Sequence, residues 1–441
     1  MSLSRRQALS STLFGAGLVG LRALASGLPI SFLLRPAHAE PGGAPSEGSE
    51  TPVAAQYLIL STSSEGDPLN ANVPGTYDFD DIAHPSDPAL RKTRLRLGDR
   101  AFDAAAPWAT LPQPVLDRTV FFHHATRTTR HPGLPGVMRL DAESVTPGEA
   151  LPALLARHLG DRLGTVQRAP LSLGPGGPGA ILGSDGHTLP ELRATALRDA
   201  LTRARSPLAA LPGLRDATLD RMSALLKQHG TRARRDTLDR LARSRHEARA
   251  LGDRLLDDLT AIQSDEADGQ VTAAAALIRM NVAPVVTISI PFGGDNHFDG
   301  ELRREAQQTV TGVQRVRELM ARLDAYDLLD RTSFAMMNVF GRTLKQHGQN
   351  GRDHWANHHA TVLIGKPFRG GVIGGLVPRG GDYYALGIDS HSGAGTDAGD
   401  IGFGDTLAAL GKTLARGLGV SEELLGERVP RGRIVRAALV G

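Results

Sequence analysis

Asp353 and His354 are neighbours in the stretch GQNGRDHWANHHA, which covers residues 348–360 and holds three histidines in thirteen positions. A carboxylate beside an imidazole is typical of divalent-cation sites and of acid–base chemistry. Arg352 precedes the pair and could form a two-pronged contact with an anionic substrate oxygen. A polar turn would account for the same residues, with Asp353 capping the backbone and His354 bonding a carbonyl. This stretch alone therefore does not distinguish the two interpretations.

A second carboxylate–imidazole pair lies in PFGGDNHFDG, where Asp295 and His297 are two residues apart. On an extended backbone, residues i and i+2 point to the same side, so both side chains could reach one ion. Asp67 follows a separate apolar run and four small hydroxyl residues, 61–64, and is a further candidate ligand. Asp-Pro is also a common turn dipeptide. Together with Asp353 and His354, these residues favour a divalent metal site.

A third polar loop, FFHHATRTTRHPG, contains His123, His124 and His131. Adjacent residues on a strand point to opposite faces, so at most one of His123 and His124 is expected to face a site. His358 and His359 precede the next apolar run, and we expect them to have a secondary role.

The absent residue types limit the chemistry further. The chain has no cysteine, which excludes disulfides, thiolate catalysis and Cys-ligated metals. Neither GxSxG nor HExxH occurs. A hydrolase with this sequence would therefore use a metal to activate a water or a hydroxyl.

The N-terminus resembles a twin-arginine export signal. Arg5 and Arg6 precede an apolar stretch that ends in the small-residue motif Ala37-His38-Ala39. An uncleaved anchor helix is the alternative, but Arg22 and Pro29 interrupt the stretch and disfavour a stable membrane span. We therefore expect passage through the twin-arginine translocation machinery, cleavage of the signal, and a periplasmic or secreted protein.

The net charge of +3 depends on this N-terminal segment. Residues 1–39 contain four arginines and no acid, and subtracting these four from the 50 Lys and Arg leaves a near balance with the 47 Asp and Glu. A nearly neutral mature chain gives no electrostatic support for binding nucleic acid.

Five short apolar runs must position the polar loops. The predicted strands are 57–60, 119–122, 285–290, 333–339 and 360–364. They alternate with helical segments, which predicts an α/β fold with a mostly parallel sheet between helices. In such a sheet the loops at the carboxyl ends of the strands converge on one crevice.

The remaining chain divides by composition. We expect a signal peptide (1–39), a disordered linker (40–54), a first part of the α/β domain (55–187), an inserted helical hairpin or bundle (188–268), and a second part of the α/β domain (269–441). Arginines and acidic residues interleave in the insertion, which favours a solvated, salt-bridged face over a basic patch.

The block FGRTLKQHGQNGRDHWANHHATVLIGKPFRGGVIGG, residues 340–375, resembles the signature block of the exported bacterial family known as domain of unknown function 1501. GDPLNANVPGTY and GGDNHFDG resemble two shorter elements of that family. Two positions depart from its pattern: Val339 stands where the family usually has an acidic residue, and the glutamine after Asp-x-His is absent. The chain is therefore identified as a divergent member.

This family is grouped with the alkaline phosphatase and sulfatase superfamily, whose members hold divalent cations at the strand ends. The resemblance implies metal ligation by Asp295, His297, Asp353 and His354, with Asp67 as a further candidate. It also implies hydrolysis of a phosphate or sulfate ester, with Arg352 contacting an anionic small molecule or envelope polymer. The alternative is a non-catalytic periplasmic or cell-surface binding protein on the same scaffold.

Overall fold

The computed structural model describes residues 53–140, 149–174, 191–202, single positions between 221 and 239, 253–346 and 350–441. The predicted signal peptide, 1–39, and nearly all of the predicted linker, 40–54, lie outside these residues. Much of the predicted helical insertion, 188–268, also lies outside them.

Seven strands form the central sheet, in the order β11-β4-β10-β7-β1-β6-β5. Their bounds are β1 (Tyr57–Ser63), β4 (Thr119–His124), β5 (Leu171–Ser172), β6 (Val285–Ile288), β7 (Thr332–Asn338), β10 (His359–Ile364) and β11 (Gly371–Ile373). Every pair of neighbours is parallel except those of β10, which runs antiparallel to both β4 and β7. The prediction of an α/β fold with a mostly parallel sheet is confirmed, and all five predicted strands are present.

Both faces of the sheet are covered, which explains why its strands are continuous apolar runs. In β1, Tyr57 and Ile59 belong to one buried cluster, whereas Leu58 and Leu60 belong to another. Successive side chains of a strand point to opposite faces, so a strand between two apolar layers needs an apolar residue at each position.

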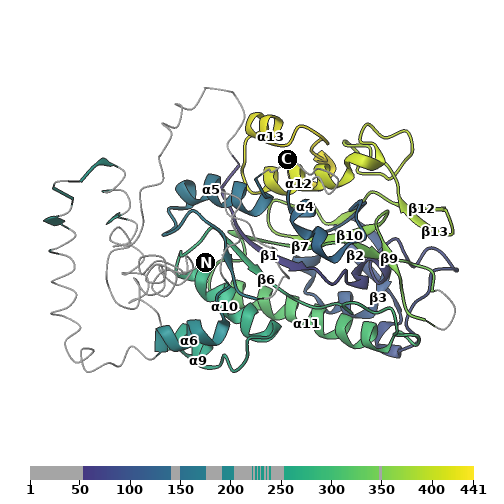
Figure 1. Cartoon of the computed structure of the whole chain (residues 1–441), viewed down its shortest axis with the longest axis horizontal. Coiled ribbons are helices and arrows are strands. Elements are labelled where there is room, and N and C mark those ends of the chain that lie inside the picture. Colours follow the sequence, from purple (N-terminus) through teal and green to yellow (C-terminus); the bar gives the residue numbers. More distant parts are fainter. Residues whose placement is uncertain are drawn as a thin grey trace, which may run out of the picture.

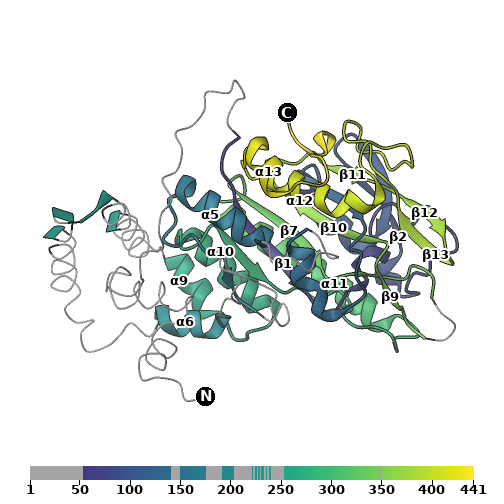
Figure 2. The ribbon, with the colours of Figure 1, turned by 45° about the horizontal axis from the view of Figure 1, so that its top comes forward.

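Helices form a layer on each side of the sheet (Figures 1 and 2). The first buried cluster includes residues of α6 (Ala194–Thr202), α9 (Asp253–Thr260), α10 (Ala267–Arg279) and α11 (Arg303–Ala325). The second includes residues of α4 (Leu134–Met138), α5 (Leu151–Leu163), α12 (Thr406–Gly417) and α13 (Glu422–Arg428). The fold is therefore a three-layer helix–sheet–helix arrangement.

Short elements complete the domain. Three two-stranded sheets pair β2 (Lys92–Leu97) with β3 (Arg100–Ala105), β8 (Gly341–Arg342) with β9 (His354–Trp355), and β12 (Leu376–Arg379) with β13 (Asp382–Ala385). The helix α3 (Gln113–Leu116) precedes β4. The β8–β9 pair is the one that matters for the site, because it contains His354.

The described helices of segment 188–268 pack against the domain. α6 and α9 contact each other, and both contact α10. In the part of the chain that the structure describes, they extend one of the two helical layers. None of the described helices is long and apolar enough to cross a membrane.

Candidate metal centre

Three connections meet at one edge of the sheet, because β4, β6 and β7 run in the same direction. The connection after β4 carries His131, in the short 3-10 helix η5 (His131–Gly133). The connection after β6 carries Asp295 and His297. The connection from β7 to the antiparallel β10 carries Asp353 and His354, and β8–β9 pairing places His354 opposite Arg342. The predicted convergence of polar loops at the carboxyl edge is therefore present.

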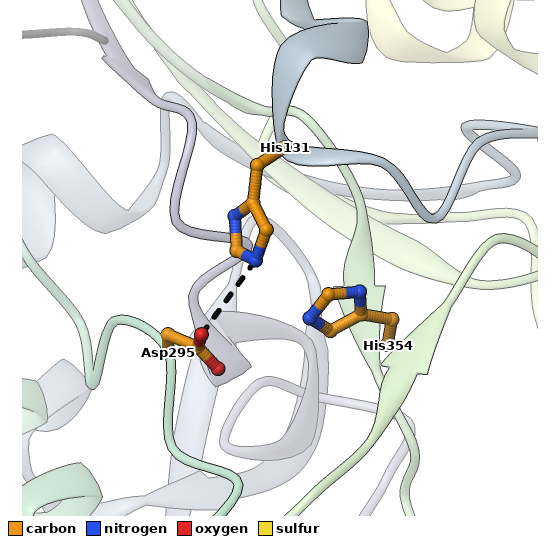
Figure 3. A group of neighbouring side chains, drawn as sticks. All are labelled: His131, Asp295 and His354. Carbon is orange, nitrogen blue, oxygen red and sulfur yellow. Dashed lines mark ion pairs between the residues drawn. The ribbon is translucent and has the colours of Figure 1, made fainter.

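His131, Asp295 and His354 form a half-buried cluster, which we call the triad. Each residue offers one ligand atom, and these atoms lie within 4.8 Å of one another. The Nε2 atom of His131 is 3.6 Å from Oδ2 of Asp295, and the two imidazole centroids are 4.7 Å apart. Figure 3 shows the two rings and the carboxylate directed toward a common space.

Backbone carbonyls orient both imidazoles of the triad. Nδ1 of His131 lies 2.7 Å from the carbonyl oxygen of Ser64, and Nδ1 of His354 lies 2.7 Å from that of Thr129. A carbonyl only accepts, so each Nδ1 carries the proton and each neutral ring keeps a lone pair on Nε2. Histidine ligands of metals are commonly held in this way.

The Nε2 atom of His354 gives the clearest support for an ion bound at the triad. It is buried and has no hydrogen-bond partner among the described residues. A buried acceptor without a partner is unfavourable, and an ion bound by the triad would satisfy it. The residues present therefore fit a divalent cation with nitrogen and oxygen ligands, such as Zn²⁺ or Mn²⁺.

Electrostatics favour the ligand forms of these groups. Burial lowers the pKa of His354. The charges of Arg342 and of the neighbouring histidines act in the same direction, so the ring stays neutral. Burial acts to raise the pKa of Asp295, but the charges of Arg342 and His297 and the Arg342 hydrogen bond hold that pKa below its usual value. His354 is thus a neutral imidazole close to the carboxylate of Asp295.

Arg342 fixes the position of Asp295. Its side chain is fully buried and donates to Oδ1 of Asp295 at 2.9 Å. It also donates to the carbonyl oxygens of Glu65, Gly66 and Arg352. Since Arg342 occupies Oδ1, Oδ2 of Asp295 is the oxygen that faces His131.

His297 and Asp353 adjoin the triad as a separate pair. Nδ1 of His297 is 3.0 Å from Oδ1 of Asp353, and its Nε2 is 3.4 Å from Oδ1 of Asp295. The side chain of Asp353 is 60% exposed. Of the four predicted ligands in these loops, Asp295 and His354 thus belong to the triad, whereas Asp353 is linked to it through His297.

Asp67 lies deeper than the sequence-based expectation placed it. It is 1% exposed, and its Oδ1 accepts the backbone N–H groups of Phe292 at 2.9 Å and Gly294 at 2.7 Å. It therefore holds the loop that leads into Asp295. Its carboxylate is not among the triad's ligand atoms.

Arg352 differs most from expectation. It is fully buried, and its Nε and one terminal nitrogen donate to both oxygens of Glu305 at 2.7 and 3.0 Å. Its other N–H groups donate to the carbonyl oxygens of Thr343, Leu344 and Ala83. All five donors are used within the fold, so Arg352 has none left for a substrate anion. The sequence showed its charge but not its buried carboxylate partner.

His131 is the triad residue that the sequence-based ligand set omits. It lies in the histidine-containing loop after β4, yet no spacing motif connects it to Asp295, which is 164 positions later. The feature of the sequence that could have identified His131 is its position in a loop after a buried strand, at the edge of the sheet where the other candidates lie.

Phe340 supports the triad from the side. It is buried, stacks on His354 with ring centroids 4.3 Å apart, and meets His131 edge-on at 5.1 Å. Gly66 lies against the same ring at a φ of +66°, and a Cβ there would lie 1.9 Å from Phe340 Cε2. Because Gly66 has no Cβ, the loop that follows β1 can pass close to the Phe340 ring, which contacts both histidines.

We expect Gly66→Ala to destabilise the protein by roughly 2–4 kcal/mol, because it adds both overpacking and left-handed backbone strain. Urea denaturation measures this loss. Gly381→Ala is the matched control: its φ is +89° but nothing lies within 4 Å of the added Cβ, so only the backbone strain applies. Equal losses in the two variants would contradict the contact with Phe340.

The other four clustered histidines form buried stacks between β4 and β10. His123 stacks on His358 with centroids 5.2 Å apart, and His124 stacks on His359 at 5.5 Å. All four are at most 2% exposed. Each stack lies on a different face of the strand pair, as expected for adjacent strand residues. None of the four contributes a ligand atom to the triad.

We predict that these histidines make the protein sensitive to acid. Burial lowers the pKa of His123 and of His359 to about 4, and lowers the pKa of His124 and of His358 well below its usual value. Between pH 6.5 and 4 the unfolded chain takes up protons that the folded chain does not, so stability is fully present above pH 6.5 and falls as the pH drops toward 4.

Urea midpoints measured across this range test the prediction. His359→Leu should reduce the pH dependence, because it removes one of the groups whose pKa is lowered. The substitution breaks no side-chain hydrogen bond, since neither ring nitrogen of His359 has a partner among the described residues. His391→Leu, at an exposed position, is the control. A pH profile that His359→Leu leaves unchanged would show that His359 does not contribute.

Fold and site together define the class of protein: an α/β domain with an imidazole–carboxylate cluster at the carboxyl edge of a mostly parallel sheet. Residues 188–386 match the family model described as "Protein of unknown function (DUF1501)", which supports the resemblance seen in the signature block. The matched region contains Asp295 and His354 and also covers segment 188–268, whereas His131 precedes it. No curated protein matches the chain.

Proposed function

We propose that the chain is an exported, divergent DUF1501 protein that binds a divalent cation and hydrolyses phosphate or sulfate esters. The observation that carries the metal proposal is the buried, unpartnered Nε2 of His354, which lies within 4.8 Å of the ligand atoms of His131 and Asp295. A cation bound there would lower the pKa of a bound water or hydroxyl and stabilise negative charge on the ester. The placement in the alkaline phosphatase and sulfatase superfamily rests on the sequence resemblance.

One residue next to the loop that carries Asp295 supports an anionic substrate. Arg304 is exposed, and its guanidinium lies against Gly294, the residue before Asp295, where a Cβ would be 2.5 Å from the Arg304 terminal nitrogen. Among the described residues, no carboxylate forms an ion pair with it. A guanidinium at this position can contact the oxygens of a phosphate or sulfate group, the role expected of Arg352 from the sequence.

Among the hydroxyl residues 61–64, we propose Ser64 as the nucleophile. Ser61 and Ser63 are buried, and their hydroxyls accept the backbone N–H groups of Ile290 and Glu65. Ser64 is half-buried, and its carbonyl oxygen holds His131 of the triad. An activated water would serve the same role without a covalent intermediate.

We further propose that residues 1–39 direct export by the twin-arginine pathway, and that the substrate is an anionic small molecule or envelope polymer. Arg5 and Arg6 and the Ala37-His38-Ala39 motif support the signal. Folded export also suits a protein that acquires its cation before translocation.

The second candidate is a non-catalytic binding protein with a structural cation. Val339 favours it: at the position where the family usually has an acidic residue, this side chain is fully buried with the apolar core. No carboxylate can come from that position, so the centre would be simpler than in related hydrolases.

Metal analysis and ester hydrolysis by the purified chain separate these functions. After reconstitution with Zn²⁺, Mn²⁺ or Mg²⁺ and dialysis, we expect about one tightly held equivalent, and metal-dependent release of phosphate or sulfate from simple esters. A bound cation without hydrolysis supports the second candidate. If none of the three ions is retained, the proposed metal centre is excluded.

A further inference from the structure

Phe298 is the most exposed large apolar side chain among the described residues. It is 96% exposed, compared with 57% for Val440 and 43% for Leu256. It directly follows His297, whose imidazole contacts Asp295. An exposed aromatic ring beside a polar site is typical of a residue that packs against a ligand.

A firm turn holds Phe298 in this position. The N–H of Asp299 donates to the carbonyl oxygen of Asn296 at 3.1 Å, and the N–H of Gly351 donates to that of His297 at 2.8 Å. The buried side chain of Asn296 donates to Glu305 at 3.0 Å. Because the residues on both sides of Phe298 are fixed, its exposure follows from the backbone path and not from fraying of a loop.

The ring of Phe298 lies close enough to the triad for one substrate to contact both. Its ring centroid is 6.5 Å from that of His297, which is 4.6 Å from that of His354. These two separations limit the distance between the rings of Phe298 and His354 to about 11 Å. A ligand whose anionic group lies at the triad can thus place one or two attached rings against Phe298.

We propose that Phe298 determines specificity by packing against a ring of the substrate, so that the preferred substrates are phosphate or sulfate esters of aryl or sugar groups and not of short alkyl groups. This inference rests on the proposed hydrolytic function and adds the substrate class. The shared chemistry is a ring with an apolar face, which packs against an aromatic side chain, whereas a short alkyl chain offers little contact area.

The test compares Phe298→Ala with the parent chain, both loaded with the cation, on phenyl, glucose and ethyl phosphates and sulfates. We expect KM for the ring esters to rise about 3- to 10-fold, with kcat nearly unchanged and the ethyl esters unaffected. Phe298→Tyr should restore the parent KM, and Leu256→Ala, an exposed apolar change on α9, should alter nothing. Comparison of phenyl with glucose esters identifies the ring.

Equal effects of Phe298→Ala on ring and ethyl esters would overturn the proposal, as would no effect on any of them. A Phe298→Ala variant that converts a dimer to a monomer in sedimentation would also overturn it, by assigning the ring to an interface between copies. If no ester is hydrolysed, the proposed function fails, and the inference is then tested by binding. Calorimetry should show tighter binding of phenylphosphonate than of methylphosphonate, and loss of that preference in Phe298→Ala; equal affinities in the parent would overturn it.

Discussion

Arg352→Ala should lower the free energy of unfolding by about 3–5 kcal/mol, the usual effect of removing one partner from a buried ion pair. Arg352 and Glu305 are both fully buried and form a two-pronged contact. Asn72 and Asn296 donate their side-chain amides to the same carboxylate at 2.8 and 3.0 Å. Without the guanidinium, Glu305 would remain as a buried charge held only by neutral amides.

Tyr77 lies close enough to this pair for both of its charges to act on the phenol. Burial raises the pKa of Tyr77, the carboxylate of Glu305 raises it further, and the charge of Arg352 lowers it. The network also reaches the triad, since the carbonyl oxygen of Arg352 accepts from Arg342, which holds Asp295. Loss of Arg352 is therefore expected to loosen the triad as well as the core.

Urea denaturation of matched variants measures this effect. Arg118→Ala is the control, because Arg118 pairs with Asp330 at the surface, with side chains 32% and 53% exposed, and such pairs contribute about 1 kcal/mol or less. The double variant Arg352→Met with Glu305→Leu should recover part of the loss, since it removes both charges. A loss for Arg352→Ala no larger than that of the control would refute the buried-pair account.

His354→Ala should weaken cation binding by on the order of 100-fold or more. Changes to groups that only orient a ligand already cost about 10- to 100-fold, and His354 itself offers the lone pair. Isothermal titration with Zn²⁺ or Mn²⁺ measures the affinity, and the rise in Tm on adding the cation gives a second readout. His391→Ala, at an exposed position away from the triad, should leave the affinity unchanged.

A comparison of His131 with Asp353 distinguishes the structural triad from the ligand set expected from the sequence. His131→Ala should weaken binding as much as His354→Ala does, because both imidazoles present Nε2 to the same space. Asp353→Ala should have a smaller effect, about tenfold, since Asp353 acts through His297. The reverse order would favour the sequence-based set over the triad.

Local sequence patterns were sufficient to predict the scaffold. The five apolar runs became the strands β1, β4, β6, β7 and β10. Each run is short, apolar and bounded by polar loops, and these properties are local in the sequence. The antiparallel direction of β10 was not predicted, because strand direction depends on the path of the connection from β7 and not on composition.

The sequence alone also determined which loops and residue types are available for chemistry at the carboxyl edge. Asp295 and His354 were identified in this way, because a carboxylate or imidazole after a buried strand is visible in one dimension. The proposed chemical class, a cation held by oxygen and nitrogen ligands, rests on the same residue types and on the absence of cysteine.

Only the tertiary structure decided which of these groups meet. It brought His131 to Asp295 across 164 positions, buried Arg352 against Glu305, and placed Asp67 behind the loop instead of in the cluster. The physical reason is that burial and pairing are properties of distant segments brought together. A charged residue in a polar loop has the same local pattern whether it faces solvent or a buried partner, and the choice between the two depends on packing across the whole fold.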